Sequence, residues 1–293
     1  MAYWSDIIYG KSQDPSENDP ESPYFMDEKY TKAPVYFPAE DYSTRKKVVD
    51  FLGRQMNRIF LNDDLTLNYS FISDTIINRY FKDLEIYYSG NIQVKRNKSY
   101  KAAELIRDRL YSVLKKHRND EIMLIGHSMG SIIAFDVLTF LAPDIRINTL
   151  ITIGSPLGLP VVISKIAGEQ KQREINRNRI TTPPGVIKNW YNFSDILDMV
   201  AFNYKLSDYY SENDHGVKPV DLLVVNNYEI EGIRNPHKSF GYLRTPEFSE
   251  ILNEFILSER LTLIRKVTCR FNKITDNLKS IITPSKIKNN VTL

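Results

Sequence analysis

Short apolar runs without regular polar alternation recur through the second half of the chain. They cover residues 122–126, 149–154, 189–193 and 221–226. Runs of this kind are typical of parallel strands that are covered on both faces. The stretches between them are long enough for crossover helices. The pattern therefore predicts an α/β domain in which a mostly parallel sheet is flanked by helices.

Helical spacing of apolar residues marks two segments that precede these runs. They lie at 44–60, with Thr44 as a candidate N-cap, and at 98–117. Residues 3–9 are predicted as a short strand. Residues 11–44 are dense in Pro, Ser, Asp and Asn, and they are predicted as an irregular loop or lid.

One large domain is predicted over residues 1–258, followed by a basic tail over 259–293. A polar stretch at 169–184 is predicted as a surface insertion. Residues 260–293 carry eight Lys or Arg and one acidic residue, a charge of +7, which leaves the rest of the chain at 3 − 7 = −4. Apolar spacing over 260–282 predicts a basic amphipathic helix. Such a helix can dock on the domain, on a protein partner or on an anionic membrane surface as a peripheral contact.

Composition narrows the setting in which this protein is expected to act. The 293 residues carry a net charge of +3, which is too small to indicate a nucleic-acid partner. The single cysteine, Cys269, rules out an intrachain disulfide and fits a reducing compartment, so a cytoplasmic protein is expected. The N-terminus lacks the pattern of a signal peptide, and no apolar run reaches the roughly 18 residues of a membrane span. The histidines lack metal-ligand spacing with Cys or Glu, so neither a metal nor another cofactor is expected.

A glycine-bracketed serine lies where the first apolar run meets a second one. Gly126-His127-Ser128-Met129-Gly130 fits the pattern G-x-S-x-G between a predicted strand and a predicted helix. Such a turn strains the serine backbone and needs small flanking residues, which Gly126 and Gly130 supply. It raises the hydroxyl above the sheet, where the helix N-terminus and Met129 N–H, as an oxyanion donor, favour negative charge. Ser128 is therefore the candidate nucleophile, although the bare pattern also fits a flexible turn.

A serine nucleophile needs a histidine base, and the order of the chain narrows the choice. In folds with this turn the partners follow the serine, which removes His117 and His127. His127 is predicted to point away from the serine and to act as a packing residue. His215 precedes a predicted strand and so lies at the wrong end of the sheet. His237 follows the last apolar run, at the edge where catalytic groups gather, and is the candidate base. The alternative for it is a loop histidine that caps a turn.

The histidine in turn needs a carboxylate at the end of an earlier strand. Asp195 and Asp198 both follow the run at 189–193 directly. Each also fits a helix cap, and the residues alone leave the choice between the two open.

Four motifs between about residues 100 and 257 resemble segments of the α/β-hydrolase superfamily, in particular its intracellular lipase- and esterase-like members. The family's nucleophile elbow resembles IGHSMGSIIAFDVL, and its next strand and pocket loop resemble TIGSPLGLP. A family segment that ends in Asp-Pro-Val-Ala is similar to WYNFSDILDMVA, with Met199 in place of the proline. The family's histidine loop resembles HKSFGYLRTPEF.

The resemblance implies a serine hydrolase that cleaves carboxylic esters through a Ser-His-Asp triad and an acyl-enzyme. Its substrate is a small-molecule or lipid ester, with acyl or lipid-like esters favoured. The family places its acid before x-Val-Ala, which corresponds to Asp198 here, with Asp195 as the alternative. The pocket loop implies five substrate-binding residues: Gly154, Ser155, Pro156, Leu157 and Leu159.

One family feature has no counterpart in this sequence. Members usually begin with a strand ending in His-Gly, and the loop after that strand supplies a second oxyanion N–H. No His-Gly precedes residues 3–9, which resemble a later family strand, so the first strand is expected to be missing or its donor replaced. Loss of one oxyanion donor lowers a rate by roughly a hundredfold or more. A weak or inactive scaffold with an interaction or regulatory role is therefore the competing hypothesis, and an acyltransferase with the same triad is a third.

Overall fold

A computed structural model describes residues 2–14, 16–19, 22, 29–34, 43–60, 82–94, 98–175 and 179–258. The chain divides into two compact units, Met1–Pro246 and Glu247–Leu293, and the described residues of the second unit are helical. The predicted basic tail at 259–293 and parts of the predicted loop or lid at 11–44 lie outside the described residues. No helix in the described part of the chain is long and apolar enough to cross a membrane.

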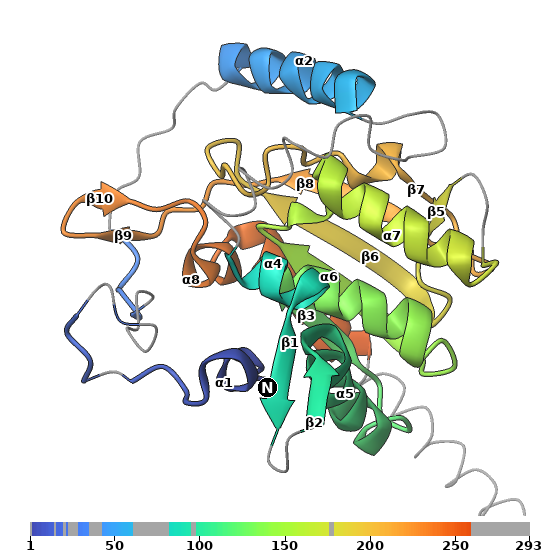
Figure 1. The fold of residues 1–293 in the computed structure, drawn as a ribbon. Coiled ribbons are helices and arrows are strands. Elements are labelled where there is room, and N and C mark those ends of the chain that lie inside the picture. The colour runs from blue at the N-terminus through green and yellow to red at the C-terminus, as the bar shows by residue number, and fades with distance from the viewer. Residues whose placement is uncertain are drawn as a thin grey trace, which may run out of the picture. The chain divides into compact units, whose positions relative to one another are not determined.

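The first unit is built on a parallel sheet (Figure 1). Its four strands lie in the order β3 (Met123–His127), β4 (Ile147–Ile153), β6 (Val186–Ser194) and β8 (Pro219–Leu223). Each neighbouring pair is parallel, and every residue of β4 is buried. The four apolar runs therefore form strands as predicted, and the prediction of a mostly parallel sheet flanked by helices is confirmed. All four strands end at the same edge of the sheet, which is where such folds place their sites.

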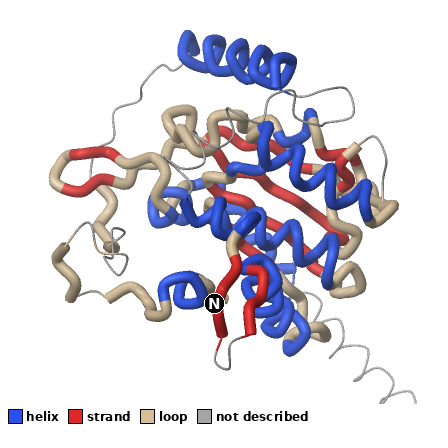
Figure 2. The backbone as a smooth tube through the Cα atoms, viewed as in Figure 1, coloured by secondary structure: helices blue, strands red, loops and turns tan. Residues whose placement is uncertain are grey.

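Helices alternate with these strands along the chain, as the blue and red segments of Figure 2 show. They include α5 (Ala102–Lys116), α6 (Met129–Asp136) with its π-helical continuation Val137–Leu141, and α7 (Pro160–Gln172). Ala102, Ile106, Leu110 and Leu114 are buried on one face of α5. The predicted apolar stripe is thus part of the core, where each of the larger aliphatic side chains stabilises the fold by about 1.5–3 kcal/mol. The predicted segment begins too early, because Lys98–Lys101 forms strand β2, paired with β1 (Asn91–Val94).

The structure differs from two other predictions for the N-terminal part of the chain. Residues 3–9, predicted as a strand, contain the helix α1 (Ser5–Tyr9), which ends at Gly10 with a φ of 76°. The strand prediction was wrong because Ile7 and Ile8 pack sideways onto the core from a single helical turn, and Gly10 supplies the left-handed C-cap. Helix α2 (Ser43–Phe60) is present as predicted, but it begins at Ser43, so Thr44 lies inside it and is not the N-cap.

Parts of the polar stretch at 169–184 belong to regular elements, and residues 176–178 lie outside the described residues. Its first residues belong to α7, where Gln170 is buried. Farther along, β5 (Ile180–Thr181) pairs in parallel with β7 (Tyr210–Ser211). The other short elements are α4 (Lys82–Ser89), α8 (Ser239–Leu243), β9 (Glu229–Ile230), β10 (Ile233–Arg234) and two 3-10 turns at Pro156–Gly158 and Leu206–Asp208.

A buried ionic cluster joins four helices of the first unit. Arg107 of α5 lies 2.7 Å from Asp136 of α6 and 2.9 Å from Glu169 of α7, and its Nε donates to the hydroxyl of Tyr87 in α4. Burial raises the pKa of Asp136 to about 6, against the opposing attraction of the Arg107 guanidinium. The arginine thus pairs with one buried and one half-buried acid and ties α6 to its neighbours. Because α6 follows Ser128 directly, the cluster also anchors the turn that carries the candidate nucleophile.

Candidate active site

Ser128 sits in a strained turn between β3 and α6. Its φ of 50° and ψ of −125° lie outside the regions that residues with a side chain ordinarily adopt. Conformations of this kind cost about 1–3 kcal/mol and persist only where the surroundings fix them. Here Ser128 N donates to Ile153 O on the neighbouring strand, and Ser131 N donates to Ser128 O. The turn predicted from G-x-S-x-G is therefore present at the end of β3.

The two glycines that bracket this turn have different surroundings. A Cβ built on Gly126 would lie 2.9 Å from both Gly130 O and Ser131 Cα, so a side chain there would collide with backbone. A Cβ built on Gly130 meets no atom of the described residues within 4 Å. The prediction that crowding requires a small residue is therefore right for Gly126 and wrong for Gly130, because the following helix turns that position away from the strand.

We expect Gly126→Ala to lower the free energy of unfolding by about 1–3 kcal/mol or more, because backbone atoms have to move to accept the methyl group. Gly130→Ala is expected to be neutral or to stabilise by up to about 1 kcal/mol, because alanine is the better helix former. Urea unfolding of the two variants measures the difference. Equal losses of stability in both would contradict this account of the turn.

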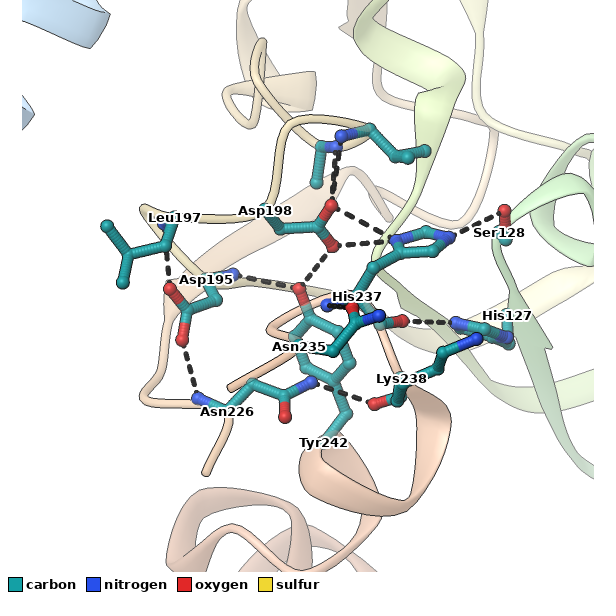
Figure 3. Close-up of polar contacts among 12 residues, drawn as sticks. His127, Ser128, Asp195, Leu197, Asp198, Asn226, Asn235, His237, Lys238 and Tyr242 are labelled. Carbon is teal, nitrogen blue, oxygen red and sulfur yellow. Dashed lines mark hydrogen bonds and ion pairs between the residues drawn. The ribbon is translucent and has the colours of Figure 1, made fainter. Parts of the chain in front are cut away.

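A loop late in the chain places His237 beside Ser128. His237 lies between β10 and α8, and its Nε2 is 3.1 Å from Ser128 Oγ. Its Nδ1 is 3.0 Å from each carboxylate oxygen of Asp198. Figure 3 shows the three side chains in a row, with the imidazole between the other two. Residues more than a hundred positions apart thus form one hydrogen-bonded chain.

Asp198 is held in a turn after β6, with its side chain fully buried. Its Oδ1 accepts a hydrogen bond from Val200 N at 2.9 Å. Its Oδ2 accepts one from the hydroxyl of Tyr242 at 2.7 Å. The carboxylate therefore faces His237 with both oxygens fixed by donors on other sides.

Asp195, the alternative acid, faces a different set of partners. Its carboxylate pairs with Arg234 at 2.8 Å and accepts from Asn226 N at 2.6 Å and Leu197 N at 2.8 Å. Burial raises the pKa of Asp195 above its ordinary value, while these donors and the arginine act in the opposite direction. Of the two aspartates, the structure places Asp198 beside His237 and turns Asp195 towards β10.

The remaining histidines have separate contacts. His127 Nε2 lies 2.7 Å from His237 O, and the two rings are 5.0 Å apart between centroids. Since a carbonyl oxygen only accepts, His127 donates from Nε2. It is a packing residue as predicted, but what it packs on is the candidate base. His117 pairs with Asp120 after α5, and His215 lies in the turn before β8.

Comparison with known families matches residues 49–214 to the PGAP1-like alpha/beta domain. The chain belongs to this family. The family is of the α/β-hydrolase type, so the superfamily indicated by the sequence motifs is correct. The matched range includes Ser128 and both aspartates and ends before His237. No curated protein and no solved structure matches the chain.

Gly154 of this PGAP1-like domain lies directly against Asp198 and His237. It follows β4 with a φ of 53°, and a Cβ there would be 2.9 Å from Asp198 Oδ2 and 3.1 Å from His237 Nδ1. The substrate-binding role of Gly154 stays a prediction, and the structure shows in addition that a side chain at this position would crowd Asp198 and His237. Ser155 caps the short turn that follows by accepting from Leu157 N.

The other predicted substrate-binding residues of the PGAP1-like domain are Pro156, Leu157 and Leu159, and all three are buried. Leu157 and Leu159 belong to the hydrophobic core. Their part in acyl binding stays a prediction, as does the oxyanion role of Met129, which is the first residue of α6.

The sequence did not predict two contacts of the site. The hydrogen bond from His127 to His237 O and the bond from Tyr242 to Asp198 join positions separated by 110 and 44 residues. Tyr242 lies in the motif that resembles the family's histidine loop, which was the available signal. Within the described residues, no group of three His, Cys, Asp or Glu is placed to hold a metal ion.

Proposed function

We propose that this PGAP1-like domain is a serine hydrolase that cleaves carboxylic esters. The observation that carries the proposal is the hydrogen-bonded chain from Ser128 Oγ through His237 to Asp198, built on a strained turn of a hydrolase-type fold. Nucleophile, base and orienting carboxylate at hydrogen-bond distance are the requirements of acyl transfer through a serine.

The geometry also sets the proton positions that this chemistry needs. An ionised carboxylate only accepts hydrogen bonds, so the proton of a neutral His237 lies on Nδ1, next to Asp198. The Nε2 lone pair then faces Ser128 Oγ. As Oγ bonds to the ester carbonyl carbon, Nε2 takes its proton and later returns it to the departing alkoxide, which leaves as an alcohol.

Water completes the proposed cycle. His237 takes one proton from water, whose oxygen attacks the acyl carbon, and then returns that proton to Ser128 Oγ as the acyl group leaves as an acid. Met129 N–H is our candidate donor to the oxyanion formed in each step. The resemblance to intracellular lipase- and esterase-like proteins leads us to propose an acyl or lipid-like ester as the substrate, without a metal or organic cofactor.

A fluorophosphonate probe tests this proposal directly. An activated serine displaces fluoride from phosphorus and keeps the phosphonyl group, so we expect the folded wild type to be labelled at Ser128. His237→Ala is expected to lose labelling because no base is left to take the hydroxyl proton. Mass spectrometry of the labelled peptide identifies the modified residue. A folded wild type that stays unlabelled would favour the scaffold hypothesis instead.

A further inference from the structure

The hydroxyl of Tyr242 bridges the two aspartates that follow β6. It donates to Asp198 Oδ2 at 2.7 Å and accepts from Asp195 N at 3.0 Å. Its side chain is among the largest of those that are fully buried. Figure 3 shows the ring below the Asp198–His237 pair, with its oxygen directed at the carboxylate. The bridge therefore reaches Asp198 from a side that does not face His237 (Figure 3).

The direction of both hydrogen bonds is fixed by chemistry. A backbone N–H only donates and an ionised carboxylate only accepts, so the Tyr242 proton must point at Asp198. Burial raises the pKa of the Tyr242 hydroxyl well above its ordinary value, and the negative charge of Asp198 raises it further. The hydroxyl stays neutral, and the donor to Asp198 Oδ2 is present throughout the range in which an esterase works.

The donors on Asp198 act on different oxygens. Val200 N and, at 3.4 Å, Ala201 N hold Oδ1, and Tyr242 alone holds Oδ2. Anchors on both atoms define the plane of the carboxylate, whereas anchors on Oδ1 alone would leave it free to turn about that atom. With the plane defined, both oxygens lie 3.0 Å from His237 Nδ1.

The helix that carries Tyr242 is itself fixed in place. Asn226 Nδ2 donates to Lys238 O just before α8, and a Cβ on Gly241 would lie 1.6 Å from Asn226 Oδ1, so helix and asparagine are in close contact. Asn226 N donates in turn to the carboxylate of Asp195. Asp195 thus holds Asn226, which in turn contacts the helix that carries Tyr242. This role explains why Asp195 is buried beside the site although its carboxylate does not contact His237.

We propose that Tyr242 is a positioning residue for Asp198, which sets the orientation of the acid and through it the orientation of His237. The inference rests on the proposed function, since it assigns Tyr242 a task in the same ester hydrolysis. It predicts a kinetic effect on the chemical step without an effect on substrate binding, because the hydroxyl faces the acid and not the serine.

Tyr242→Phe tests the proposal, with Tyr210→Phe as the matched control. Tyr210 is equally buried, and its hydroxyl donates to Leu157 O in the core, so the control also removes one buried hydroxyl. We expect Tyr242→Phe to lower kcat for ester hydrolysis by about ten- to a hundredfold with KM unchanged, the range for a hydrogen bond to a charged group. Tyr210→Phe is expected to keep kcat within about threefold of wild type, at a similar loss of stability.

A second readout does not depend on activity. The proton on His237 Nδ1 is expected to give a low-field NMR resonance, assigned by its absence in His237→Ala. In Tyr242→Phe this resonance should shift or broaden, because Asp198 loses one donor and its plane is released. In Tyr210→Phe it should stay where the wild type has it.

The outcomes separate this inference from the proposed function. Unchanged resonance and unchanged kcat in Tyr242→Phe would overturn the positioning role, as would equal changes in both tyrosine variants. A wild type that neither reacts with the fluorophosphonate nor hydrolyses esters overturns the proposed function. The resonance then decides by itself whether Tyr242 orients the Asp198–His237 pair.

Discussion

Ester hydrolysis by the Ser128→Ala variant is expected to fall about 10⁶-fold below wild type, towards the uncatalysed rate. The methyl group cannot form the acyl-enzyme, and His237 is left without the hydroxyl that it activates. What survives is the contribution of binding and of oxyanion donors, because the rest of the site is unchanged. The fold itself should tolerate the change, since the hydrogen bond between Ser128 Oγ and His237 is the last one of the chain that runs from Asp198.

The measurement is hydrolysis of a series of esters with short to long acyl chains by wild type and variant. A matched control is Ser194→Ala, because the buried Ser194 hydroxyl has no hydrogen-bond partner among the described residues. Removing it should leave turnover and stability near wild type. The chain length that gives the highest kcat/KM identifies the acyl class. Equal rates for wild type and Ser128→Ala would show that any hydrolysis arises elsewhere.

Asp198→Asn is expected to lower kcat by about 10⁴-fold, whereas Asp195→Asn is expected to keep it within about tenfold. An amide at position 198 presents an N–H₂ group to neighbours that are all donors, namely Val200 N, Tyr242 Oη–H and His237 Nδ1–H. It thereby favours the tautomer of His237 whose Nε2 carries a proton and cannot accept one from Ser128.

Asp195→Asn should instead appear as a loss of stability. The change removes the negative charge that pairs with Arg234, whose side chain is only 18% exposed, and breaking a buried ion pair costs about 3–5 kcal/mol. Steady-state kinetics and urea unfolding, applied to both variants, separate the two roles. If turnover is lost in Asp195→Asn and kept in Asp198→Asn, the assignment of the acid is reversed.

Much of this fold could be predicted because its signals are local. The apolar runs of β3, β4, β6 and β8 are short and continuous, and no partner far along the chain is needed to recognise them, although only β4 is buried along its whole length. The turn at Ser128 is equally local, since a strand, a crowded Gly126 and a helix within a few residues determine its geometry. The direction of parallel strands puts their carboxyl ends at one edge, which is where the partners of Ser128 were sought. Elements whose conformation depends on their immediate neighbours could therefore be predicted from the sequence.

The predictions that were wrong concern short segments whose conformation depends on distant contacts. Residues 3–9 have too few positions for a strand and a helical turn to differ in pattern, and the packing of Ile7 and Ile8 on the core decides for the helix. Gly130 matches a motif, yet its surroundings are set by the path of α6 and are open among the described residues.

The sequence by itself determined the sheet, the strained serine and the pair of candidate acids behind it. The residues alone left open the choice between Asp195 and Asp198, which are three residues apart in one turn and chemically identical. The family resemblance favoured Asp198, and the tertiary structure places Asp198 beside His237. Arg234 and Asn226 draw one carboxylate away, while Tyr242 and Val200 hold the other against His237. A carboxylate takes its role from the donors around it, and most of those donors come from segments that meet only when the chain is folded.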